Sequence, residues 1–395
     1  MKRRRWSIAV VAAVLAAAAA VGFFMKTERL QWDLKVYMAC SRTLASGGDP
    51  YTSVPTVDGI GYQCLYPPLA TDLYRPFAAA SDAWAGSGEK IWAGLKVLSL
   101  VLMLWLWRDF LLAPGADFPR LLFIALAYGS PFWSDFRSGN ASSFEHLVLW
   151  AGLAAFVAGK DLWFIVLTAA AAQPKLLPVA FLGLALARPR PRPLLFLGGA
   201  VLTVGAFGLN ELVHPGLLRG FFHQLADPSQ PWRFERGPNN CSVYGFLEHV
   251  IEVATGDRGR AVTLATSLHF LWSAAVAAVT GVSLLRLWKN PGTERAKRLS
   301  TLLLYCAAYA LVVPRLKDYS FFLLIPPTLA ALESGAPAGI LWSIAIFAVL
   351  NSTKALGAKL GMGHWDILLG YFKLYAVVLT WGVLAFYPLH KKERA

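Results

Sequence analysis

Residues 162–187 read LWFIVLTAAAAQPKLLPVAFLGLALA, two apolar runs separated by the polar break Gln173-Pro174-Lys175. Each run holds roughly a dozen residues, whereas a helix needs about 20 to cross a bilayer. As one helix, the stretch would carry the basic residues 188–192 to the outer side of the membrane. As two short helices that turn back below the outer surface, it keeps them on the cytoplasmic side, where positive loops are found. We therefore predict two helices here.

Apolar runs of this kind recur from Trp6 to the C-terminus of the 395-residue chain. Only 15% of the residues are charged and the mean hydropathy is +0.50, whereas soluble globular proteins carry about 25% charged residues. These values exclude a soluble fold, and we predict an all-α polytopic membrane protein, a bundle of about 10 to 12 transmembrane helices. The predicted segments are 6–25, 91–107, 119–134, 141–159, 162–173, 176–187, 194–213, 261–286, 299–313, 319–333, 338–353 and 367–388.

The basic residues indicate how these segments are oriented. Clusters at residues 2–5, 188–192, 286–298 and 391–394 fall on one side of the membrane if the chain crosses it once in each of the twelve segments given above. Because positive loops stay in the cytoplasm, we expect both termini there, in a bacterial inner membrane. This orientation accounts for the net charge of +14. We therefore expect membrane lipids as partners, and no nucleic acid.

Two connectors are long, residues 26–90 and 214–260, and both fall on the outer side of the single domain expected for residues 1–395. Apolar residues at helical spacing within both loops, as in 34–45 and 217–225, predict amphipathic helices that lie along the interface. Short helices joined by charged loops predict a water-filled recess, because backbone at membrane depth needs water or protein around it. The outer loops would form the walls of this recess.

Asp33 follows the first predicted segment and begins the first interfacial helix. A carboxylate beside a lipid interface can accept a proton from an attacking hydroxyl group and so act as a general base. The alternative is an N-terminal helix cap, a position where Asp is favoured. Position alone favours the cap.

Further charged residues fall at the outer ends of the short helices, where charges near membrane depth are costly. They are Asp135, Arg137, Lys175, Arg315, Lys317 and Asp318. The basic ones could hold a lipid phosphate, Arg as a fork and Lys as a point charge. The alternative is internal ion pairing, Asp135 with Arg137 and Lys317 with Asp318.

Other motifs limit the chemistry. The chain has no Walker loop, GxGxxG, GxSxG or paired Asp motif of metal-dependent sugar-nucleotide transferases, so we expect no nucleotide, no metal and no other cofactor. The polar residues 239–242 could bind sugar hydroxyls or form a turn. Cys40, Cys64 and Cys241 fall in outer loops, where a disulfide or free thiols are both open.

Three segments of the first loop carry a resemblance: Asp33-Leu34-Lys35-Val36-Tyr37, Gly48-Asp49-Pro50-Tyr51 and Tyr66-Pro67-Pro68-Leu69. Weaker matches follow in Gly139-Asn140, Pro174-Lys175-Leu176-Leu177-Pro178 and Asn240-Cys241-Ser242-Val243-Tyr244-Gly245. Together they resemble glycosyltransferase family 87, which has the GT-C fold. The family is similar in plan to the mycobacterial phosphatidylinositol-mannoside mannosyltransferases.

This resemblance implies a membrane glycosyltransferase that moves a hexose, with mannose expected, from a polyprenyl-phosphate sugar to a lipid or glycan acceptor on the outer face. It also implies Asp33 as the general base, which favours base over cap. We expect the donor phosphate to be bound by Arg137, Lys175, Arg315 and Lys317. The expected substrate contacts are Tyr37, Asp49, Tyr51, Tyr66, Asn140, Asn240 and Ser242. A monophosphate leaving group held by basic side chains needs no metal, and one direct displacement would invert the anomeric configuration.

The chain departs from the family pattern at one motif, and two alternative functions remain open. Some family members carry a His-bearing motif where this chain reads Pro314-Arg315-Leu316-Lys317-Asp318-Tyr319, so a His-dependent step is not carried over. A transporter or flippase of lipid-linked sugars would use the same recess without a base, although we find no internal repeat of the kind transporters often show. A lipid-linked glycan ligase would use a pyrophosphate donor instead.

Overall fold

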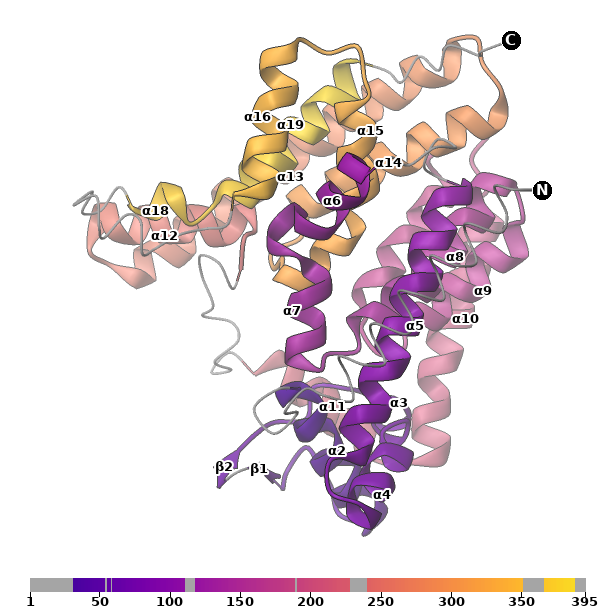
Figure 1. Cartoon of the computed structure of the whole chain (residues 1–395), viewed down its shortest axis with the longest axis vertical. Helices are drawn as coiled ribbons and strands as arrows, with labels where there is room; N and C mark the ends of the chain where they lie inside the picture. Colours follow the sequence, from indigo (N-terminus) through magenta and orange to yellow (C-terminus); the bar gives the residue numbers. More distant parts are fainter. Residues whose placement is uncertain are drawn as a thin grey trace.

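The structure, a computed structural model, describes residues 31–53, 55–57, 59–110, 118–188, 190–227, 240–350 and 366–387. Within these residues the chain is almost entirely helical, which confirms the predicted all-α class (Figure 1). The strands there form one short antiparallel hairpin, β1 (Thr56–Val57) with β2 (Ile60–Gly61). The predicted first segment, 6–25, lies outside the described residues.

The first long loop is folded into helices at one end of the bundle (Figure 1). These helices are α2 (Trp32–Ala45), α3 (Pro68–Asp72) and α4 (Arg75–Ala83). The second long loop contributes α11 (Leu217–Ala226) and α12 (Val243–Thr255). Helices were predicted in both loops from their apolar spacing, and that part of the prediction is confirmed.

The apolar segments form the bundle itself. The first half comprises α5 (Ser87–Phe110), α6 (Phe118–Leu126), η2 (Ala127–Gly129), α7 (Pro131–Ser138), α8 (Ser142–Ala158), α9 (Asp161–Ala171), η3 (Leu177–Ala185) and α10 (Pro193–Val213). The second half comprises α13 (Arg258–Lys289), α14 (Glu294–Val312), η5 (Asp318–Leu323), α15 (Ile325–Leu332), α16 (Ala338–Val349), α18 (Asp366–Leu369) and α19 (Phe372–Phe386). The predicted break in residues 162–187 is present, between α9 and η3.

Two segments predicted as single helices are broken. The segment 119–134 becomes α6, η2 and α7, because Tyr128 and Ser130 adopt left-handed backbone conformations (φ 57° and 56°) that interrupt a right-handed helix. The segment 319–333 becomes η5 followed by α15, which has proline at its start. Proline lacks the N–H that a continuing helix would bond, so the helix restarts at Pro326-Pro327.

Three helices in the described part of the chain are long and apolar enough to cross a membrane: Ser87–Trp107 within α5, α10 and α13. Four more, α8, α9, α16 and α19, are apolar but shorter. Few residues of α10 and α13 are buried inside the protein, as expected of helices whose apolar side chains meet lipid. The number of crossings and their direction remain predictions.

α2 differs from the predicted helix lying along the interface. One side packs Leu34, Tyr37 and Met38 into a cluster with α3 and α4. Another side packs Val36 and Cys40 into a second cluster with the hairpin and α11. The helix is therefore buried on both sides, which fixes the direction of its polar residues more firmly than a lipid surface would.

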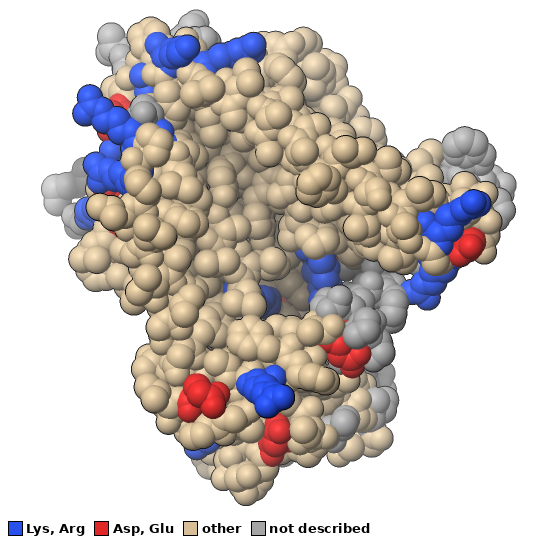
Figure 2. Space-filling model, turned by 180° about the vertical axis from the view of Figure 1, so that it is seen from behind, with Lys and Arg blue, Asp and Glu red and all other residues tan. Residues whose placement is uncertain are grey.

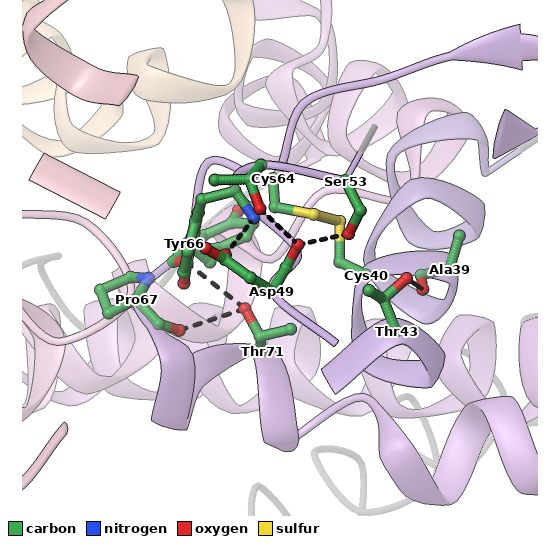
Figure 3. Close-up of a disulfide and its surroundings, with 11 residues drawn as sticks. Ala39, Cys40, Thr43, Asp49, Ser53, Cys64, Tyr66, Pro67 and Thr71 are labelled. Atoms are coloured by element: carbon green, nitrogen blue, oxygen red, sulfur yellow. Dashed lines mark hydrogen bonds between the residues drawn. A yellow bond between two sulfur atoms is a disulfide. The ribbon is translucent and has the colours of Figure 1, made fainter. Parts of the chain in front are cut away.

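A disulfide bond joins Cys40 of α2 to Cys64, with Cα atoms 6.0 Å apart (Figure 3). Beside it, the backbone N–H of Tyr51 donates to Asp49 Oδ1 (2.8 Å) and closes a turn. Cys241 is buried and is not part of this disulfide. The question that the sequence left open is settled in favour of a disulfide for the first two cysteines only.

Candidate active site

Asp33 lies in the first turn of α2, but it does not cap the helix. The N-cap residue is Gln31, which has a left-handed backbone (φ 62°) and makes no side-chain capping bond. Instead, Asn140 Nδ2 donates a hydrogen bond of 2.8 Å to Asp33 Oδ2. The interpretation of Asp33 as a helix cap was therefore wrong, and its carboxylate faces another part of the chain.

The backbone around Gly139 brings Asp33 and Asn140 together. The N–H of Gln31 donates to the carbonyl oxygen of Arg137 (2.7 Å), which ties the start of α2 to the end of α7. Gly139 ends α7 with φ +75°, and a Cβ there would lie 2.7 Å from Cα of Gln31. Only glycine allows this close approach.

Asn140 connects the carboxylate to a cation. Its Nδ2 donates to Asp33 and to the Tyr37 hydroxyl (3.0 Å). Its Oδ1 accepts from Ser142 Oγ (2.8 Å) and from Lys175 Nζ (2.9 Å). Both amide protons and the amide oxygen are thus engaged, which fixes the orientation of the amide group.

Lys175 comes from the predicted break between α9 and η3, and its three protons all have partners. Besides Asn140, its Nζ lies 2.6 Å from Ser142 Oγ and 3.1 Å from Glu145 Oε2. It also lies 4.6 Å from the ring centroid of Tyr319. Sequence reasoning missed Ser142 and Glu145, although their spacing of three residues places them on one face of α8 beside Asn140.

Tyrosines form one wall of the cluster. The ring centroids of Tyr37 and Tyr66 lie 4.5 Å apart, and the Tyr66 hydroxyl donates to Asn140 Oδ1 at 3.5 Å. Tyr51 stands behind them, donating its hydroxyl proton to the carbonyl oxygen of Tyr66 (2.6 Å). Asp49, which was predicted to contact substrate, shapes the turn before Tyr51 (Figure 3).

Asn240 and Ser242, also predicted substrate contacts, bond the backbone of the segment that carries Arg315 and Lys317. Asn240 Oδ1 accepts from the N–H of Leu316 (3.0 Å). Ser242 Oγ donates to the carbonyl oxygen of residue 314 (2.7 Å) and, as the N-cap of α12, accepts from the N–H of Gly245 (3.0 Å). The two side chains therefore hold this basic segment in place.

The structure shows other ion pairs than those considered as the alternative to phosphate binding. Asp135 pairs with Lys96 of α5 (2.7 Å), and both side chains are buried. Asp318 pairs with Lys373 of α19 (2.6 Å). The fold brings Lys96 and Lys373, which are distant in sequence, to the same depth in the bundle as these two aspartates. Arg137, predicted to hold phosphate, has an exposed side chain.

The surroundings of Asp33 shift its pKa in opposite directions. Burial raises the pKa of Asp33, while the bond from Asn140 and the charges of Lys317, Lys175 and Lys96 lower it in part. The net effect is a raised pKa, because burial disfavours the charged form of the carboxyl. Among the described residues, no group of three or more His, Cys, Asp or Glu side chains gathers to hold a metal ion.

Several apolar helices, with a carboxylate, an amide and lysines gathered at one end, define a multi-pass membrane protein with a candidate catalytic site. The sequence matches glycosyltransferase family 87 over residues 65–314. The match covers more than half of the chain, so the chain belongs to glycosyltransferase family 87. Asn140 and Lys175 lie within the matched region, and Asp33 precedes it.

Among solved structures, the chain is similar to ArnT from Cupriavidus metallidurans bound to undecaprenyl phosphate. The alignment covers 95% of this chain and 76% of that one, at 15% identity and a TM-score of 0.41. No curated protein matches the chain.

Proposed function

We propose that this protein transfers a hexose, with mannose the first candidate, from a polyprenyl-phosphate sugar to a lipid or glycan acceptor. The observation that carries the proposal is the single amide of Asn140, which holds the carboxylate of Asp33 at one end and the ammonium of Lys175 at the other. A base and positive charge side by side suit a displacement at an anomeric carbon with a phosphate leaving group.

In the proposed reaction, Asp33 accepts the proton of the acceptor hydroxyl. The hydroxyl oxygen forms a bond to the anomeric carbon of the donor sugar as the bond between that carbon and the phosphate oxygen breaks. The lipid phosphate leaves with the electron pair of the broken bond. One displacement of this kind inverts the anomeric configuration, and a positioned base contributes about 10²- to 10⁴-fold to such a rate.

The basic residues divide their roles in this proposal. Lys317 lies close enough to Asp33 to lower its pKa, and with Arg315 on the same anchored segment it stabilises the leaving phosphate. Lys175 is already paired with Glu145 and Asn140, so it acts mainly by holding the amide. Tyr37 and Tyr66 bind the sugar or acceptor beside Asn140.

The proposed site lies at the outer face of the membrane. The cluster is built from the first long loop and the ends of α7 and α8, which the charge distribution assigns to the outer face of the inner membrane. The polyprenyl chain of the donor would lie in the bilayer beside it. No nucleotide enters the reaction.

Donor consumption tests the function directly. Purified protein in lipid nanodiscs is incubated with polyprenyl-phosphate sugars that carry labelled mannose, glucose or galactose, together with a membrane glycolipid extract. We expect loss of one labelled donor and release of polyprenyl phosphate. A transporter would move the donor across a vesicle membrane and leave it intact, which would refute the proposal.

A further inference from the structure

A cavity of about 380 Å³ lies at the other end of the bundle from the Asn140 cluster. Its lining residues are Arg188, Arg190, Arg192, Trp288, Glu294, Lys297 and Arg298. α10 begins directly after Arg192 and ends beside His214, which bonds Asp72 of the first loop (2.6 Å). A helix of 21 residues is about 30 Å long, so this cavity is separate from the proposed active site.

The cavity has an excess of positive charge. Two arginines share one carboxylate: Arg188 Nη2 lies 2.7 Å from Asp161 Oδ1, and Arg192 bonds the other oxygen. Arg298 pairs with Glu294 (2.7 Å). Five basic side chains therefore face two carboxylates. Figure 2 shows Lys and Arg side chains gathered at the upper end of the molecule, whereas the acidic side chains of this face lie mostly lower.

Two buried hydrogen-bond donors in the lining have no acceptor within the described part of the chain. They are Arg188 Nε, on a side chain that is 4% exposed, and Trp288 Nε1. Buried polar groups in proteins are nearly always paired. Lys297 lies beside them, with its Nζ 5.9 Å from the Trp288 ring centroid. Both atoms are closed to water, so they do not open into the cavity. The observation that points to an anionic ligand is the excess of basic side chains around one cavity.

The surroundings indicate where that anion comes from. Apolar side chains next to the cavity are strongly exposed: Leu162 is 68% exposed, Leu194 82% and Leu285 66%. Leu162 follows Asp161 directly, Leu194 lies two positions after Arg192, and Leu285 precedes Trp288 by one helical turn. Such side chains suit acyl chains, and basic pockets between membrane helices bind lipid head groups.

We propose that this cavity binds the phosphate of an anionic membrane phospholipid, with the acyl chains lying along α9, α10 and the end of α13. Arg190, Arg192 and Lys297 attract the phosphate, while Arg188 stays paired with Asp161. Two phosphates on one head group, as in cardiolipin, fit the charge excess best. The site is independent of the transfer reaction and would exist in a protein that moved no sugar.

The test uses the full-length protein in nanodiscs of phosphatidylcholine with or without cardiolipin. Retained cardiolipin is counted by native mass spectrometry, and thermal unfolding is followed in parallel. The variant Arg190→Gln/Lys297→Gln removes two lining cations and keeps the ion pairs that Arg188, Arg192 and Arg298 form with Asp161 and Glu294. The matched control Arg258→Gln/Arg260→Gln removes two exposed arginines from the opposite end of α13. A third arm adds inorganic phosphate to the cardiolipin-free sample.

We expect cardiolipin to be retained by the wild type and the control, and retention to fall at least tenfold in the cavity variant. The rise in unfolding temperature that cardiolipin causes should be lost with it. Equal retention in the cavity variant and the control would overturn the proposal. So would stabilisation by inorganic phosphate that cardiolipin does not match, because the site would then take a free anion.

Discussion

At the scale of single residues, Asn140 organises the candidate site. The Gly139-Asn140 pair could be recognised in the sequence, and Asn140 was predicted to contact substrate. Its partners could not be read from spacing, because Asp33 is 107 positions and Lys175 is 35 positions away. The same limit applies to the ion pairs, since Asp135 pairs with a lysine 39 positions away and not with the neighbouring Arg137 that the alternative considered. Which charged residues lie at the same depth in the bundle, and can therefore pair, depends on the fold and not on sequence spacing.

The bond from Asn140 should be visible in the pH dependence of transfer. Activity requires ionised Asp33, so kcat/KM falls as the pH drops below the pKa of this carboxyl. The bond from Asn140 favours the charged form and lowers this pKa. Asn140→Ala should therefore move the acid limb of the kcat/KM profile to higher pH, besides lowering the plateau. Thr43→Ala, in α2 but away from the cluster, should keep the wild-type limb. An unmoved limb in Asn140→Ala would show that another group controls it.

At the scale of elements, apolar periodicity located most of the described helices, and the break at residues 173–175 was predicted, but two other breaks were not. Hydrophobicity does not report backbone direction, so the left-handed turn at 128–130 and the restart at Pro326 were hidden within apolar runs. Spacing also predicted α2 but not its burial on two sides, since burial depends on the loop folding back over it. That folding is reinforced by the bond between Cys40 and Cys64.

Removing this disulfide should loosen the first loop. The two cysteines are 24 positions apart, and closing a loop of this length is worth about 3 to 4 kcal/mol in the chain-entropy account. We expect Cys40→Ser/Cys64→Ser to lower the thermal unfolding temperature in nanodiscs and to reduce transfer, because α2 carries Asp33. Reductant should destabilise the wild type and leave the double variant unchanged. A wild type insensitive to full reduction would contradict a stabilising role.

At the scale of the whole molecule, composition was enough to predict a helical membrane protein, and charge distribution predicted its direction. The number of crossings depends on short and broken helices, whose depth in a bilayer is set by tertiary packing rather than by their own length. The two ends of the bundle nevertheless differ in chemistry. One end holds the Asn140 cluster under the folded first loop, and the other holds the basic cavity.

Labelling from one side of the membrane tests this orientation. Ala83→Cys at the end of α4 and Lys289→Cys at the end of α13 are both exposed positions. The native thiols give little background, since Cys241 and Cys306 are buried and the other two are bonded. In spheroplasts, an impermeant maleimide should label Ala83→Cys at once and Lys289→Cys only after the membrane is permeabilised. The opposite pattern would invert the topology and move the proposed site to the cytoplasmic face.

Single-turnover consumption of the labelled donor measures whether Asp33 is the base of the proposed sugar transfer. Asp33→Asn keeps the shape of the side chain and removes its basicity, so we expect the rate to fall by about 10²- to 10⁴-fold with an unchanged unfolding temperature. Asp82→Asn is the matched control, because this carboxylate sits in an exposed pair with Arg42, and it should transfer at the wild-type rate. Wild-type turnover by Asp33→Asn would contradict the account.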